Sequence, residues 1–332
     1  MAGHLHTAAI QPVSARVATS LPSQLEPAPL SGLGWLALAA VAVVYAWSVA
    51  TLVRMPGNDL TEPLFLFGAL VVAFPLLAWA LTRRQAVERV IAAPTSMPQV
   101  WAMLGYLAVF AAAILGYGFS EINAVYPGQP TQSIVKLLLK LLTMVALPWL
   151  LFAGSSPRAR ASTIVIRRNV VALIVLGVAF LAFQCVVGRG LQNLSALHPT
   201  SLTLLWAIPF CLLWQTVEAG LCEEVLFRRV LQERLAGATG SQVAAIACSS
   251  LLFGLAHAPG LYLRGASLLE GVGAPTPMWA VAYSIAMIAP AGVVFGVVWA
   301  RTRCLWLVVV LHGVVDLLPQ LAGFIQDWQH AF

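Results

Sequence analysis

The sequence predicts an all-α integral membrane protein, a polytopic bundle of about nine transmembrane helices. Three observations predict this fold class: an apolar composition, a series of apolar runs of membrane-spanning length, and arginines that gather in alternate loops. Of the 332 residues, 60% are hydrophobic and 9% are charged, whereas soluble globular proteins carry about 25% charged residues. The composition therefore excludes an ordinary soluble protein.

Each of the apolar runs is long enough to cross a bilayer, which takes roughly 17 to 25 residues of helix. A helix that was missed or split would disturb the alternation of charge between successive loops, so the charge pattern supports the count of nine. The runs occupy residues 31–53, 63–81, 98–119, 133–153, 168–187, 202–220, 241–257, 278–300 and 303–326.

Most of the basic residues lie in the N-terminal segment and in every second loop between the apolar runs. The positive-inside rule places such residues in the cytoplasm, so we expect a cytoplasmic N-terminus and an extracytoplasmic C-terminus in the inner (cell) membrane of a bacterium. The net charge of +6 is spread too thinly to form a nucleic-acid-binding surface, and we expect no nucleic-acid partner. The basic residues in question are Arg16, Arg83, Arg84, Arg89, Arg158, Arg160, Arg167, Arg168, Arg228, Arg229, Arg234, Arg301 and Arg303.

The chain divides into three parts by composition. Residues 1–30 are rich in proline and lack the apolar core of a signal peptide, which predicts a flexible cytoplasmic tail. Residues 31–190 hold about five helices without an assignable motif. Five of the twelve acidic residues lie on helices after residue 200, so any chemistry is expected within residues 200–326.

The densest group of charges begins at the end of the sixth run. Glu224 and Arg228 stand at positions i and i+4 with the acid first, the favoured orientation for an ion pair on a helix. Glu223 lies about 100° around the helix from its neighbour and remains available for proton chemistry. Glu218 would lie about 140° from Glu223 on an α-helix, so we expect it to matter far less.

Two histidines lie in later apolar runs. His257 follows Phe253 by four residues at the end of the seventh run, which we expect Pro259 and Gly260 to stop. His312 precedes Asp316 by four residues inside the ninth run, so each pair shares one helix face. Counted at 1.5 Å per residue from the cytoplasmic turns, these groups and Glu223 lie at depths of roughly 14 to 24 Å. They can therefore meet in one layer inside the membrane.

Lys136 and Lys140 are also charged residues within an apolar run. They lie within roughly 12 Å of the start of the fourth helix, so we expect their long side chains to reach the lipid headgroups. A functional role for them is the less favoured interpretation.

The three polar segments resemble the motifs of the CPBP family (CAAX proteases and bacteriocin-processing enzymes), which are glutamic-type intramembrane endopeptidases. The family patterns are E-E-x-x-x-R, F-x-x-x-H and H-x-x-x-N/D. They read here as Glu223-Glu224-Val-Leu-Phe-Arg228, Phe253-Gly-Leu-Ala-His257 and His312-Gly-Val-Val-Asp316, in the family's order. The resemblance covers about residues 200–326 and implies a catalytic core in the last four helices.

The resemblance also implies a role for each matched residue. Glu223 and His257 would hold and activate a water that attacks a peptide carbonyl, with Glu223 as the general base. His312 and Asp316 would stabilise the oxyanion, while Glu224, Arg228 and Phe253 would support the site. The sequence departs from the eukaryotic CAAX enzymes at Asp316, where they have asparagine. Because an ionised carboxylate would repel an oxyanion, Asp316 must be protonated or must orient His312.

Two alternatives remain open from the sequence. Two histidines and a glutamate could bind zinc, but a glutamate used as a ligand cannot serve as a base, and we favour a site without metal or other cofactor. The polar groups could also belong to a proton-coupled transporter or a non-catalytic membrane scaffold. The leading hypothesis is an endopeptidase whose partners are the lipid bilayer and a membrane-associated protein or peptide substrate.

Overall fold

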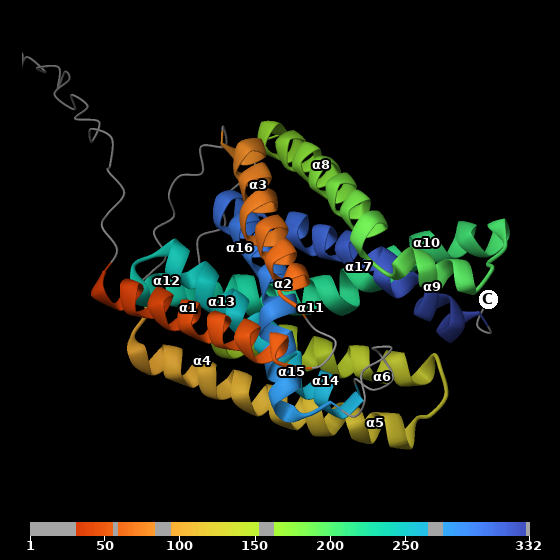
Figure 1. The fold of residues 1–332 in the computed structure, drawn as a ribbon, viewed down its shortest axis with the longest axis horizontal. Helices are drawn as coiled ribbons and strands as arrows, with labels where there is room; N and C mark the ends of the chain where they lie inside the picture. The colour runs from red at the N-terminus through yellow and green to blue at the C-terminus, as the bar shows by residue number, and fades with distance from the viewer. Residues whose placement is uncertain (1–30, 56–58, 84–93, 153–162, 265–274, 330–332) are drawn as a thin grey trace, which may run out of the picture.

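A computed structural model describes residues 31–55, 59–83, 94–152, 163–264 and 275–329 (Figure 1). In these ranges the chain forms helices and no strand, and nine helices are long and apolar enough to cross a membrane. The predicted all-α membrane bundle with nine spans is thus confirmed for the described part of the chain. The predicted tail at residues 1–30 lies outside the described residues.

Several spans contain π-helical stretches, labelled η, in which the backbone hydrogen bonds run from i to i+5 instead of i to i+4. The elements in chain order are α1 (Gly32–Val53), α2 (Thr61–Leu66), η1 (Phe67–Ala73), α3 (Phe74–Thr82), α4 (Met97–Val109), η2 (Phe110–Gly118), α5 (Phe119–Val125), α6 (Thr131–Lys140), η3 (Leu141–Ala146), α7 (Leu147–Phe152), α8 (Thr163–Val187), α9 (Gly190–Ala196), α10 (Ser201–Gln215), η4 (Thr216–Leu221), α11 (Cys222–Glu224), η5 (Val225–Gln232), α12 (Glu233–Thr239), α13 (Gln242–Ala256), α14 (Ala258–Arg264), α15 (Pro277–Tyr283), η7 (Ser284–Ile288), α16 (Ala289–Thr302) and α17 (Leu305–Trp328).

The third, sixth and seventh spans end well after the residues that the sequence pattern predicts, the third at Val125. The sixth runs from Ser201 to Thr239 without a break, because its polar second half stays helical inside the bundle. The seventh is not stopped at Pro259, since α14 follows α13 directly and extends the span to Leu263. A proline is tolerated in the first turn of a helix because its missing N–H would have no partner there.

The arginine-rich ends of several spans meet at one end of the bundle. Arg301, near the end of α16, donates to the backbone oxygen of Thr82 at 3.2 Å, at the end of α3. Arg303 forms an ion pair with Glu233 at the start of α12. Burial lowers the pKa of Arg303, and the nearby charge of Arg229 lowers it further. The ends that the charge pattern assigns to one side of the membrane therefore lie together.

Two glycines let the ninth span approach the sixth closely. A Cβ atom on Gly313 of α17 would overlap Thr216 at the start of η4, and one on Gly220 would overlap the backbone of Val309. Small residues allow such close backbone contact between membrane helices. The contact between α17 and η4 brings the histidine of one span beside the glutamates of the other.

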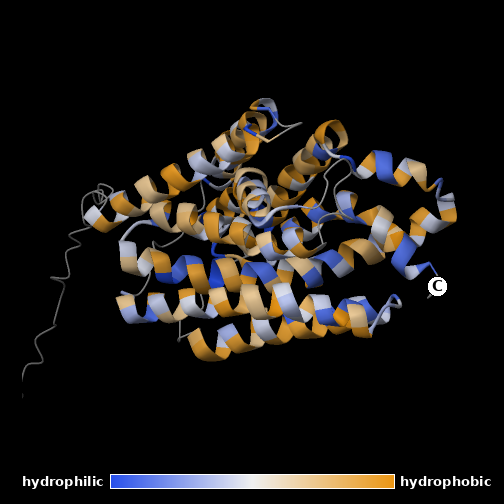
Figure 2. Cartoon of the chain, turned by 60° about the horizontal axis from the view of Figure 1, so that its bottom comes forward, coloured by the Kyte–Doolittle hydropathy of each residue, from blue (hydrophilic) through white to orange (hydrophobic). Residues whose placement is uncertain are grey.

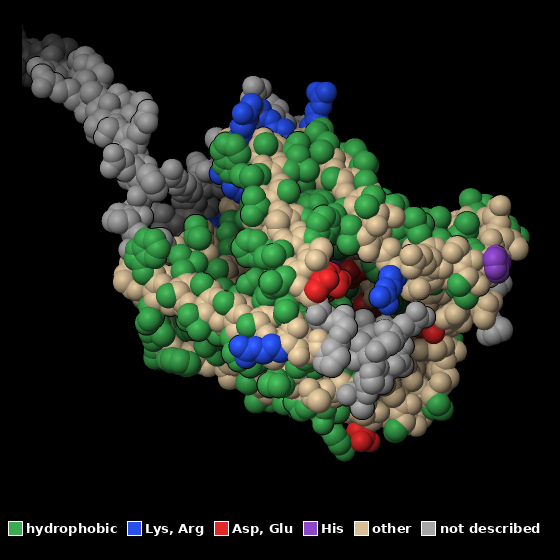
Figure 3. Space-filling view, in the orientation of Figure 1, with side chains coloured by type: hydrophobic (Ala, Val, Ile, Leu, Met, Phe, Trp, Pro, Cys, Tyr) green, Lys and Arg blue, Asp and Glu red, His purple; other side chains and the backbone are tan. Residues whose placement is uncertain are grey.

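The outer surface of the bundle suits contact with lipid. Large apolar side chains are exposed on many spans, for example Trp35, Leu150 and Val186. In Figure 2 hydrophobic residues predominate along the helices, while hydrophilic ones gather at helix ends and on helices in the middle of the bundle. Figure 3 shows hydrophobic side chains over most of one face, and a hollow near its middle with acidic and basic side chains at the rim.

Candidate active site

The two neighbouring glutamates lie on α11, a short α-helical stretch between the π-helical segments η4 and η5. Such π-helical turns inside α-helices occur frequently at functional sites. Glu224 is fully buried, whereas the side chain of Glu223 is 12% exposed. The sixth span thus buries one carboxylate and turns the other toward a cavity.

The predicted catalytic side chains line one cavity of about 520 Å³. Glu223 comes from α11, His257 from the C-terminal end of α13, and the other two from α17. The meeting of these groups in one layer, which their depths predict, is therefore observed. The side chains concerned are Glu223, His257, His312 and Asp316, and Phe253 lines the same cavity.

Glu224 and Arg228 form the predicted ion pair. Arg228 Nε donates to Glu224 Oε2 at 3.0 Å, and both side chains are fully buried. Arg228 also donates to the hydroxyl of Ser249 on α13 at 3.3 Å and lies 5.3 Å from the centre of the Phe253 ring. The charge pattern of the sequence places Arg228 among the cytoplasmic arginines at the ends of the spans. This prediction is wrong, because Arg228 is buried inside the bundle in an ion pair.

His312 has carboxylate oxygens near both of its ring nitrogens. Its Nδ1 atom lies 2.7 Å from Glu224 Oε1, within hydrogen-bond distance. Its Nε2 atom lies 3.5 Å from Asp316 Oδ2 and 3.8 Å from Glu223 Oε2. The ring stacks on Phe295 of α16 with centroids 4.5 Å apart. These contacts fix the plane of the ring and turn Nε2 toward the cavity.

His257 is held by the backbone of its own helix. Its Nδ1 atom lies 2.8 Å from the carbonyl oxygen of Phe253, which can only accept a hydrogen bond, so Nδ1 carries the proton. A neutral imidazole has one donor and one acceptor nitrogen, and Nε2 is then the acceptor. Phe253 also packs edge-on against the His257 ring, with centroids 5.0 Å apart.

Lys140, which sequence reasoning did not assign to the site, lies beside the glutamates. Its Nζ atom is 2.7 Å from Glu218 Oε1 and 3.6 Å from Glu223 Oε1, and its side chain is only 7% exposed. The expectation that this lysine reaches the headgroups is therefore wrong. The depth of a residue in the membrane can be counted along its own helix. The sequence does not show which other helix packs against that residue.

Glu218 also lies nearer to Glu223 than an α-helix would place it. Both carboxylates contact the same ammonium group, that of Lys140. The wider turns of the π-helix η4 bring residues five apart toward the same face, whereas an α-helix would separate them by about 140°. The expectation that Glu218 lies away from the site therefore rested on the wrong helical geometry.

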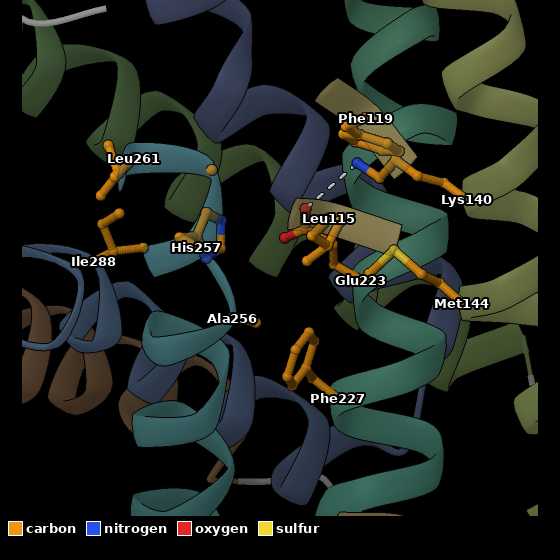
Figure 4. Close-up of a pocket in the computed structure, with 11 residues that line it drawn as sticks. Leu115, Phe119, Lys140, Met144, Glu223, Phe227, Ala256, His257, Leu261 and Ile288 are labelled. Atoms are coloured by element: carbon orange, nitrogen blue, oxygen red, sulfur yellow. Dashed lines mark ion pairs between the residues drawn. The ribbon is translucent and has the colours of Figure 1, made fainter. Parts of the chain in front are cut away.

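A second cavity, of about 230 Å³, shares Glu223 and His257 with the first. Figure 4 shows these two side chains facing one another across it, with Lys140 joined to Glu223. The rest of its lining is largely apolar. Leu115, Phe119 and Met144 come from the third and fourth spans, and Phe227, Leu261 and Ile288 come from later spans. The glutamate and histidine thus stand between a polar and an apolar cavity.

The arrangement offers no evident metal site. In the described part of the chain, no three side chains of His, Cys, Asp and Glu come together so that they could hold a metal ion. The two histidines use Nδ1 in contacts with a backbone carbonyl and with Glu224. What the residues do offer is carboxylates and two imidazoles around one cavity.

Comparison with known proteins identifies a family for part of the chain. Residues 203–318 match the family model described as Type II CAAX prenyl endopeptidase Rce1-like. The match spans about a third of the chain and contains all three motif segments, and it agrees with the predicted resemblance to the CPBP family. No curated protein and no solved structure matches the chain.

Proposed function

Because residues 203–318 match the Rce1-like family of type II CAAX prenyl endopeptidases, we propose that this integral membrane protein is an intramembrane endopeptidase. It hydrolyses a peptide bond of a membrane-associated protein or peptide with a water molecule activated by Glu223. The observation that supports this proposal best is that Glu223, His257, His312 and Asp316 line one cavity within the membrane spans.

In the proposed reaction, the water lies between Glu223 and His257. Glu223 accepts one proton of the water, while the other O–H of the water donates a hydrogen bond to Nε2 of His257 and keeps its proton. The water oxygen forms a bond to the carbonyl carbon, and the carbonyl oxygen becomes an oxyanion. When the C–N bond breaks, Glu223 returns the proton to the departing amine, which regenerates the carboxylate.

His312 stabilises the oxyanion in this mechanism. As an imidazolium it donates from Nδ1 to Glu224, at 2.7 Å, and from Nε2 into the cavity. A donor that is held in place before the reaction costs no reorganisation when charge develops on the substrate. Asp316, 3.5 Å from Nε2, acts by holding the ring in this orientation. In this role Asp316 does not itself contact the oxyanion.

The proposed mechanism needs no metal ion or other cofactor. Zinc bound by His257, His312 and Glu223 would remove the general base. The apolar cavity beside Glu223 accommodates an apolar part of the substrate next to the bond that is cleaved. We further propose that the arginine-rich end of the bundle faces the cytoplasm of a bacterial cell and that the C-terminus faces outward.

The proposal is tested by replacing the base without changing its volume. Membrane fractions are compared between cells that carry the wild-type protein and cells that carry Glu223→Gln, by mass spectrometry of protein termini. Glu121→Gln is the matched control, because Glu121 is exposed and lines neither cavity.

We expect at least one membrane-associated protein to have a new terminus in the wild-type and Glu121→Gln cells that is missing in the Glu223→Gln cells. The loss of a general base corresponds to a decrease of about 10²- to 10⁴-fold in rate. If Glu223→Gln cells contain the same termini as wild-type cells, the protein does not use Glu223 as a base, and a scaffold or transporter becomes the better interpretation.

A further inference from the structure

Lys140 lies in the fourth span, outside the residues that match the endopeptidase family. On the proposed function, we infer that it is a positioning residue that holds the carboxylate of Glu223 for proton abstraction. Lys140 is anchored by Glu218 and lies near one oxygen of Glu223, and the side chains of Lys140 and Glu223 are both largely buried.

The two oxygens of the Glu223 carboxylate face two different nitrogen groups. Oε1 lies 3.6 Å from Lys140 Nζ, and Oε2 lies 3.8 Å from His312 Nε2. Both distances are too long for a hydrogen bond, yet each places a nitrogen within ion-pair range of one oxygen. The carboxylate plane is therefore set from both sides, while each oxygen can still accept a proton from water.

Lys140 is itself held in place by Glu218. Its Nζ atom lies 2.7 Å from Glu218 Oε1, a distance typical of a charge-assisted hydrogen bond. This contact keeps the ammonium group from moving onto Glu223, where a direct hydrogen bond would compete with the proton of the water. Glu218 thus sets the separation between the lysine and the base.

The backbone around Lys140 is fixed as well. Lys140 is the last residue of α6 and precedes the π-helical segment η3. In η3, the carbonyl oxygen of Thr143 accepts a hydrogen bond from the hydroxyl of Tyr106 on α4. The Thr143 hydroxyl donates to the carbonyl oxygen of Leu139 at 2.7 Å. The third and fourth spans are thereby joined one turn from Lys140.

A purely structural role for the lysine would be to neutralise buried carboxylates. Removing one partner of a buried ion pair leaves the other as an uncompensated charge and destabilises a protein, whereas removing both charges together is often tolerated. The two roles therefore differ in what happens when Lys140 and Glu218 are neutralised in the same molecule.

The experiment compares purified full-length variants in detergent: Lys140→Met, Lys140→Arg, the double variant Lys140→Met/Glu218→Gln, and Glu223→Gln. Lys136→Met is the matched control, because Lys136 lies one turn earlier on the same helix and does not line either cavity. For each, kcat and KM are measured on the substrate whose terminus depends on Glu223, together with thermal unfolding.

We expect Lys140→Met to lower kcat by about 10- to 100-fold, the range expected when a catalytic group is misplaced, with little change in KM. Lys140→Arg should recover most of the lost kcat, and Lys136→Met should resemble the wild type. The double variant should recover thermal stability but not kcat. Recovered stability with unrecovered kcat in the double variant would show that Lys140 positions the base and does not only stabilise the fold.

Recovery of both stability and kcat in the double variant would show that Lys140 serves the fold alone. A rise in KM with unchanged kcat in Lys140→Met would instead make it a substrate-binding residue. Failure of the proposed function is distinguishable from both results, because the purified wild-type protein would then leave this substrate uncleaved.

Discussion

Glu224 and His312 lie 88 positions apart in the chain, yet Oε1 of the glutamate is 2.7 Å from Nδ1 of the histidine. The other oxygen of Glu224 accepts from Arg228 at 3.0 Å. Glu224 therefore joins the sixth and ninth spans and leaves Nε2 as the histidine atom that faces the cavity. Because all three side chains are buried, loss of any one of them leaves a polar group in an apolar environment.

The buried ion pair predicts a large effect of Arg228→Met on stability. The fully buried Glu224 would lose the guanidinium that pairs with its Oε2 and keep only the contact with His312, and breaking a buried ion pair destabilises proteins by about 3–5 kcal/mol. Arg229→Met is the control, because Arg229 is only half-buried and lies over the Trp149 ring at 5.8 Å. Its loss should cost about 1 kcal/mol or less. Thermal unfolding in detergent measures both, and equal transition temperatures would contradict the argument.

Asp316 should tolerate asparagine and not leucine. Asp316→Asn keeps an oxygen 3.5 Å from His312 Nε2, so most of the activity should remain. Asp316→Leu has no acceptor and should lose at least about tenfold in kcat/KM, or about 1.4 kcal/mol in transition-state stabilisation. Full activity of the leucine variant would remove Asp316 from the mechanism.

The pH dependence of the same two enzymes separates the roles open to Asp316. If it orients His312 as an ionised carboxylate, Asp316→Asn should lose activity at a lower pH than the wild type, because the His312 imidazolium then lacks the negative charge 3.5 Å from Nε2. If it donated to the oxyanion as a neutral acid, wild-type activity would fall as the pH rises through its ionisation, and the asparagine variant would lack that decline.

Activity should not depend on a metal ion. Enzyme dialysed against a chelator should retain its activity, and elemental analysis of the purified protein should find no stoichiometric zinc. This expectation follows from the proposed use of Glu223 as a base and from the finding that, among the described residues, no three His, Cys, Asp or Glu side chains are placed to hold a metal ion. Loss of activity on dialysis, with specific recovery on addition of zinc, would make His257 and His312 ligands.

The close approach of α17 and η4 predicts a selective effect of added methyl groups. Gly313→Ala would overlap Thr216, and such overpacking costs roughly 1–3 kcal/mol. It should also lower kcat, because His312 is the adjacent residue. Gly323→Ala, on the same helix, meets nothing within 4 Å and should be neutral or stabilising. Similar melting temperatures for the two variants would show that the helices can separate without cost.

The spans and the motif residues could be predicted from the sequence because each depends on local patterns. Apolar length identified nine spans, and the i, i+4 spacing identified the pair of Glu224 and Arg228. Counting depth along helices also predicted that Glu223, His257 and His312 could meet, since helices fix the rise per residue.

What the sequence could not supply depends on neighbours and on helical winding. Lys140 lies close enough to the start of its helix for its side chain to reach the headgroups. Only the packing of the fourth span against the sixth places it beside Glu218. The apolar cavity is missed for the same reason, because Leu115 and Phe119 come from a span without a motif. The predicted direction of the Glu218 side chain was wrong because each residue of a π-helical stretch turns the chain by a smaller angle than in an α-helix.

The π-helical segment η4 makes the site sensitive to chain length as well as to composition. A π-turn accommodates more residues than an α-helical turn. Deleting one residue of η4, such as Val217, would let the segment return to α-helical winding at about 100° per residue. Glu218 and Glu223 would then point in different directions, although every charged group of the site would still be present. The number of residues that precede Glu223 therefore matters to the proposed site as much as the presence of Glu223 itself.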